Sequence, residues 1–123
     1  MTEEQIHRLV TSTLRHLRVC FIHVPMGGKR AANSGRVMRA MGAPKGFPDI
    51  LILDPPPALL NSAGAGTRAC VGAALELKTA KGRVSPQQQA WLDRLKERGW
   101  HVGVAHGDEQ ALAFLRECGY LAA

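Results

Sequence analysis

The spacing of apolar residues along this chain predicts three helices. In each of them, apolar residues recur every three to four positions, which is the period of a helix with one buried face. Thr2 and Ser85 precede two of these stretches and are expected to be N-caps, and Gly99 is expected to end the second helix. The predicted helices cover residues 3–17, 86–98 and 108–118.

Four shorter apolar stretches predict strands, over residues 19–24, 49–53, 70–77 and 100–105. The second of these is apolar on both faces behind its initial aspartate, which is typical of a central strand. The order α-β-β-β-α-β-α predicts an α/β fold in which a central mixed sheet is flanked by helices. A length of 123 residues predicts a single domain, residues 1–123.

Two stretches between these elements show neither the helical nor the strand pattern of apolar residues. Residues 26–48 are rich in glycine and basic residues, and we expect a basic loop there with a helical turn near residues 35–41. Residues 55–69 begin with three prolines and continue with glycine, alanine and serine, so we expect a surface loop.

Composition and charge narrow the class of protein. No apolar run is long enough for a membrane-spanning helix, and the acidic N-terminus does not have the pattern of a secretory signal. Sixteen Lys and Arg against ten Asp and Glu give a net charge of +6, which favours polyanionic partners. The three cysteines form no C-x-x-C pair and the histidines show no ligand spacing, which argues against zinc and fits a reducing cytoplasm.

Asp49, Glu76 and Lys78 form the candidate chemical cluster. Glu76 and Lys78 are two residues apart in a predicted strand and therefore share a face, and Asp49 joins them if its strand is the neighbour. Two carboxylates, with the backbone carbonyl of Leu77, suit an ion such as Mg²⁺, and a lysine beside them suits phosphodiester hydrolysis. An isolated Glu-x-Lys triplet is more often an ordinary ion pair on a solvated strand, so the motifs around it decide the interpretation.

Those motifs resemble the PD-(D/E)xK nuclease superfamily and, more narrowly, the VRR-NUC family of virus-type replication-repair nucleases. The resemblance runs through HVPxGGKR, GFPD, ELKT and SPxQ, which occupy residues 23–30, 46–49, 76–79 and 85–88. It implies a restriction-endonuclease-like fold and metal-dependent cleavage of DNA phosphodiester bonds, with no organic cofactor.

The resemblance also implies roles for individual residues. The expected catalytic residues are Asp49, Glu76, Lys78 and Gln88. The expected ligands of an Mg²⁺ or Mn²⁺ ion are Glu3, Asp49, Glu76 and the backbone of Leu77. Glu4 is an alternative to Glu3, which we favour because it lies three residues before Ile6 on the predicted buried stripe.

The expected substrate is DNA. Basic loop residues are expected to bind its phosphates: Lys29, Arg30, Arg36, Arg39, Lys45, Lys81 and Arg83. Trp91 and Trp100 are expected to pack in the core or an interface rather than against bases.

Small stand-alone members of the family resemble Holliday-junction resolvases that act as homodimers, in keeping with the two symmetric cuts that a four-way junction requires. This makes branched DNA the first expectation, in the cytoplasm of a bacterial or phage-infected cell. The alternatives are a nuclease for flaps, nicks or duplex DNA, a non-catalytic DNA-binding module with the same fold, or a subunit of a larger replication or recombination assembly.

Overall fold

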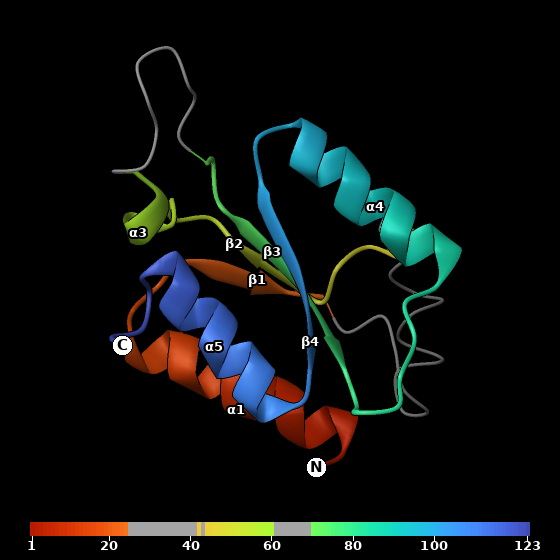
Figure 1. Ribbon diagram of the computed structural model, residues 1–123, viewed down its shortest axis with the longest axis horizontal. Coiled ribbons are helices and arrows are strands. Elements are labelled where there is room, and N and C mark those ends of the chain that lie inside the picture. The colour runs from red at the N-terminus through yellow and green to blue at the C-terminus, as the bar shows by residue number, and fades with distance from the viewer. Residues whose placement is uncertain (25–41, 43, 61–69) are drawn as a thin grey trace.

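Helices and strands alternate along the chain in the manner expected of an α/β protein (Figure 1). The computed structural model describes residues 1–24, 42, 44–60 and 70–123. Its elements are α1 (Glu3–His16), β1 (Phe21–His23), β2 (Ile50–Ile52), α3 (Pro57–Leu60), β3 (Ala73–Lys78), α4 (Pro86–Glu97), β4 (His101–His106) and α5 (Asp108–Cys118). Each predicted helix and strand is present, with ends that differ from the prediction by three residues or fewer.

Reciprocal side-chain caps begin the two helices that carry candidate site residues. At α1, Thr2 Oγ1 accepts a hydrogen bond from the Gln5 N–H (3.2 Å), and Gln5 Oε1 accepts one from the Thr2 N–H (2.8 Å). At α4, Ser85 and Gln88 form the same pair, at 3.2 and 2.8 Å. These bonds satisfy N–H groups that a helix leaves without partners at its start, so both predicted N-caps are confirmed.

The four strands form one sheet in the order β1-β2-β3-β4. β2 is antiparallel to both β1 and β3, whereas β3 and β4 are parallel, so the sheet is mixed as predicted. In the β2–β3 register Ile50 lies opposite Leu75. Asp49 precedes Ile50 and Glu76 follows Leu75, so this register brings the two acidic residues to the same point between neighbouring strands.

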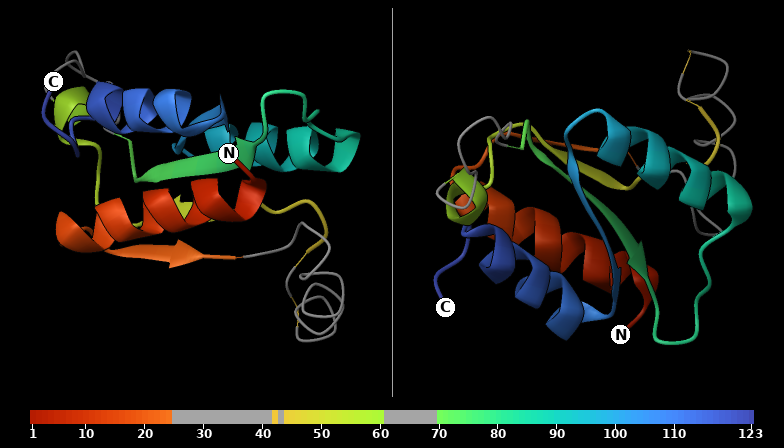
Figure 2. Two further views of the ribbon diagram at one scale, coloured as in Figure 1. Left: turned by 90° about the horizontal axis from the view of Figure 1, so that it is seen from below. Right: turned by 45° about the horizontal axis from the view of Figure 1, so that its top comes forward.

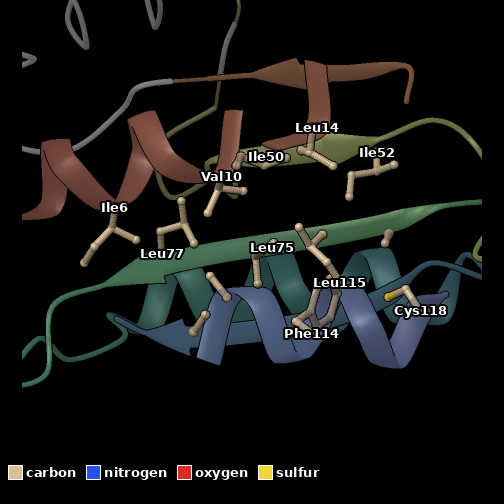
Figure 3. Packing of buried hydrophobic residues seen from close by; sticks show 13 residues of the cluster. Ile6, Val10, Leu14, Ile50, Ile52, Leu75, Leu77, Phe114, Leu115 and Cys118 are labelled. Carbon is tan, nitrogen blue, oxygen red and sulfur yellow. The ribbon is translucent and has the colours of Figure 1, made fainter. Parts of the chain in front are cut away.

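Helices α1 and α5 pack together on one face of the sheet. Figure 1 and the right-hand view of Figure 2 show them side by side, with β4 running between α5 and α4. Figure 3 shows the α1 residues Ile6, Val10 and Leu14 pointing toward the strands, where they meet Leu115 from α5. The buried cluster consists of Ile6, Val10, Leu14, Ile50, Ile52, Ala73, Leu75, Leu77, Ala105, Ala111, Phe114, Leu115 and Cys118.

Strand β3 contributes residues to this core from one face and to the candidate site from the other. Leu75 and Leu77 belong to the cluster under α1 and α5. Because successive side chains of a strand point to opposite faces, Glu76 and Lys78 point to the other face, where Gln88 of α4 hydrogen-bonds to Glu76. The sheet therefore has α1 and α5 on one face and α4 on the other.

The prediction of a surface loop over residues 55–69 was wrong for the first part of this stretch, because Pro57–Leu60 form the short helix α3. The Leu59 N–H donates to the Pro56 carbonyl (3.1 Å), and Pro57 has the fixed φ that suits a first helical position. Gly119, at the end of α5, packs directly against Ala58. Residues 61–69 and the turn expected near 35–41 lie outside the described residues.

None of the helices that the structure describes is long and apolar enough to cross a membrane.

Candidate active site

Asp49 lies at the start of β2 and is held by the neighbouring strand. Its Oδ2 accepts a hydrogen bond from the Leu77 N–H (2.7 Å), and the residue is only 3% exposed. The N–H and C=O of a strand residue point toward the same neighbouring strand, so the Leu77 carbonyl also faces the Asp49 side. The β2–β3 pairing thus fixes one carboxylate and brings a backbone oxygen to the same edge.

Glu76 is 2% exposed and is held from the opposite side by α4 and by its own strand. Gln88 Nε2 donates to Glu76 Oε1 at 3.0 Å, and Lys78 Nζ lies 3.7 Å from the same oxygen. The second carboxylate oxygen, Oε2, is buried and has no hydrogen-bond partner among the described residues. Burying a carboxylate oxygen without a partner is costly, so this oxygen is suited to bind a cation.

Burial and the neighbouring Asp49 carboxyl disfavour the charged form of Glu76. Burial raises the pKa of Glu76 above its usual range, and the nearby Asp49 carboxyl raises it further. Burial also raises the pKa of Asp49, although the hydrogen bond from the Leu77 N–H opposes this increase. A divalent cation bound between the two carboxyls would compensate their charges and stabilise their ionised forms.

Two α1 residues complete the cluster. Glu3 and His7 are one helical turn apart, and His7 Nε2 lies 3.7 Å from Glu3 Oε1 and 3.8 Å from Asp49 Oδ2. Ligand atoms of these three residues all lie within 4.8 Å of one another, which is close enough to share a metal ion. Glu4 points elsewhere, because its Oε1 is 3.0 Å from Arg8 Nη2.

The donors present fit a divalent cation. Glu3, Asp49 and Glu76 offer carboxylate oxygens, the ligands that Mg²⁺ and Mn²⁺ accept. Two buried polar atoms of the cluster, Glu76 Oε2 and His7 Nε2, have no hydrogen-bond partner in the part of the chain that the structure describes.

Sequence reasoning missed His7. The predicted site omitted His7 because the histidines show no metal-ligand spacing relative to one another. The available signal was the i, i+4 spacing of Glu3 and His7, which puts both side chains on the same face of a helix.

The remaining predicted residues are basic loop residues and two tryptophans. Lys45, Lys81 and Arg83 are exposed on the loops before β2 and after β3, where phosphates can reach them. Lys29, Arg30, Arg36 and Arg39 lie outside the described residues. Trp91 is partly buried against Phe47, with ring centroids 5.4 Å apart, and Trp100 is partly buried beside Gly72, so packing accounts for both rings.

A mixed four-stranded sheet with buried carboxylates and a lysine where its two central strands meet fits a nuclease-type, DNA-processing fold. The family model of the VRR-NUC domain matches residues 1–109, and the chain belongs to this family, as its motifs predicted. A solved VRR_NUC domain protein has the same fold, with a TM-score of 0.65 and 20% identity over 95% of this chain and 87% of that chain. No curated protein sequence matches the chain.

Proposed function

We propose that this protein is an endonuclease that hydrolyses DNA phosphodiester bonds with Mg²⁺ or Mn²⁺ and prefers branched DNA, above all four-way junctions. The observation that carries the proposal is the cluster of Asp49, Glu76 and Lys78, joined by Glu3 from α1. A protein that only binds DNA gains nothing from buried carboxylates beside the phosphates, because like charges repel.

Glu3, Asp49 and Glu76 would hold the metal ion, with the Leu77 carbonyl beside them. When bound, the ion supplies Lewis-acid activation of water and of the attacked phosphate. Lys78 brings a positive charge to the phosphate oxygens, where negative charge increases in the transition state. Gln88 holds the Glu76 carboxylate in place, and the Leu77 N–H does the same for Asp49.

Substrate choice follows from charge and symmetry. Lys45, Lys81 and Arg83 would contact the DNA backbone without reading its sequence, together with the basic residues of the 26–48 segment. The described part of the single domain, residues 1–123, carries one such cluster, so a two-fold homodimer would make the two symmetric cuts that resolve a junction. The same chemistry would serve recombination and repair in the cytoplasm.

Cleavage of labelled synthetic DNA tests this proposal. The panel contains a four-way junction, a flap, a nicked duplex and a plain duplex, each assayed at one salt concentration with Mg²⁺ and with Mn²⁺. Preferred cleavage of the junction is expected. Preferred cleavage of flaps, nicks or duplex would change the proposed substrate but not the proposed hydrolysis reaction. Tight binding without cleavage would favour a non-catalytic DNA-binding module.

Lys78→Ala tests the mechanism. We expect junction cleavage to fall by about 10²-fold or more, since removing one group that stabilises transition-state charge has effects of that order. Lys96→Ala is the matched control, because Lys96 is exposed on α4 and outside the cluster. Equal cleavage by wild type and Lys78→Ala would remove Lys78 from the mechanism.

A further inference from the structure

His7 has a buried ring nitrogen that the proposed mechanism does not use. The His7 side chain is 11% exposed, and its Nε2 has no hydrogen-bond partner among the described residues. This nitrogen nevertheless lies beside two carboxylate oxygens, at 3.7 Å from Glu3 and 3.8 Å from Asp49. These distances are too long for hydrogen bonds but allow one ion to contact all three atoms.

The other ring nitrogen of His7 is held by a second histidine. His7 Nδ1 lies 2.7 Å from His23 Nε2, and the two rings meet edge to face. Two ring nitrogens in contact share one proton. A proton on His7 Nδ1, donated to His23, leaves a lone pair on His7 Nε2, beside the carboxylates. Metal-binding histidines are oriented in this way, through a hydrogen bond from the ring nitrogen that does not bind the metal.

We propose that His7 supplies a nitrogen ligand at the acidic site and that the site therefore prefers Mn²⁺ to Mg²⁺. Imidazole nitrogen suits first-row transition ions, whereas Mg²⁺ takes oxygen ligands and keeps its waters. His23 is a positioning residue, because it acts on the metal through His7. This inference rests on the proposed function, since it refines the metal site that the nuclease would use.

Metal titration of the complete protein tests the preference. Isothermal calorimetry with MnCl₂ and with MgCl₂ gives the ratio of the two affinities without DNA and without any cleavage assay. In His7→Ala we expect Mn²⁺ affinity to fall at least tenfold and Mg²⁺ affinity to change far less. His16→Ala, an exposed histidine on the same helix, is the matched control and should keep the wild-type ratio.

Electron spin-echo spectroscopy of the Mn²⁺-loaded protein tests the bond itself. A directly bound imidazole nitrogen gives a ¹⁴N modulation, which we expect in wild type and in His16→Ala and not in His7→Ala. His23→Phe keeps an aromatic ring and removes the hydrogen-bond acceptor. Because it disturbs the orientation of His7, we expect it to weaken Mn²⁺ binding by about 10-fold.

The outcomes separate this inference from the proposed function. If wild type binds Mn²⁺ without a nitrogen modulation and with the same Mn²⁺/Mg²⁺ ratio as His7→Ala, the nitrogen ligand is overturned and the nuclease proposal stands. If wild type binds neither ion, both are overturned. Should His7→Ala fail to fold, the modulation in wild type and in His16→Ala still decides.

Discussion

Gln88 makes two hydrogen bonds that serve different ends. Its Oε1 accepts from the Ser85 N–H and begins α4, while its Nε2 donates to Glu76 Oε1 on β3. The amide is suited to both because it carries an acceptor and a donor on one group. A single residue thereby fixes the start of a helix relative to a carboxylate of the candidate site.

Substitutions of Gln88 and Ser85 test the hydrogen bond to Glu76 separately from the helix cap. Gln88→Glu keeps an oxygen for the Ser85 N–H but loses the donor to Glu76 and adds a like charge, so we expect junction cleavage to fall more than tenfold at neutral pH. Ser85→Ala removes the cap at a cost of about 1 kcal/mol in the free energy of unfolding and leaves the bond to Glu76. It should keep cleavage near that of wild type. Unchanged cleavage by Gln88→Glu would show that this bond does not support the site.

The buried carboxyls predict a pH dependence of stability. Burial raises the pKa of Glu76 to about 9 and that of Asp49 to about 6, so above pH 4.5 the metal-free folded state binds more protons than the unfolded state. Stability therefore falls as pH rises through this range. Burial lowers the pKa of His7 and His23, which has the opposite effect below about pH 6.5. Between pH 7 and 9 Glu76 is therefore the main contributor, with a smaller contribution near pH 9 from Cys118, because burial also raises the pKa of that thiol.

Urea unfolding in the presence of a chelator measures this dependence. Wild type should lose stability between pH 7 and 9, and Glu76→Gln, which cannot ionise, should lose much less. Adding Mn²⁺ should restore the stability of wild type at pH 9, because the ion binds the charged carboxylates of the folded state alone. Parallel pH profiles for the two proteins would contradict the assigned pKa of Glu76.

Among the elements, the turn before β2 places Asp49. Gly46 has φ +86°, in the left-handed region, and a Cβ there would lie 2.8 Å from the Gln87 backbone carbon at the start of α4. The loop can pass this close to the helix only with glycine at that position. The close approach keeps the segment that leads into Asp49 against the helix that carries Gln88.

Gly46→Ala should therefore destabilise the protein by about 2–4 kcal/mol, from positive φ and overpacking together. Gly42→Ala is the matched control, because Gly42 also has positive φ (+108°) but no described atom within 4 Å of its Cβ position. We expect Gly42→Ala to cost about 1 kcal/mol. Chemical denaturation measures both, and equal losses would mean that the contact with α4 contributes nothing.

Element types were predictable wherever the local signal was complete. Capping residues and helical periods identified α1, α4 and α5, and the apolar run behind Asp49 identified β2. Helix α3 was missed, because a run of prolines is read as a break and its single turn gains stability from packing against α5. That packing has no counterpart in the local sequence.

For the whole molecule, net charge +6 predicts DNA affinity that falls steeply with salt, because bound phosphates release counterions. The double variant Lys81→Gln, Arg83→Gln removes two exposed charges near β3 and should reduce the slope of log K against log salt by about 2. Fluorescence anisotropy of a labelled junction, with EDTA to prevent cleavage, measures the slope. Arg116→Gln, on the exposed side of α5, should leave it unchanged, and a double variant with the wild-type slope would remove this loop from the DNA interface.

By itself the sequence determined the α/β class, the helix caps and the motif order that identified the family, since all of these depend on residues near one another along the chain. It also placed Glu76 and Lys78 on one face, which follows from strand geometry alone. Only the tertiary structure decided that His7 and Glu3 meet Asp49. That meeting depends on how α1 packs across the sheet through Ile6, Val10 and Leu14, and a local pattern specifies which face of a helix is buried but not which distant residue it will contact.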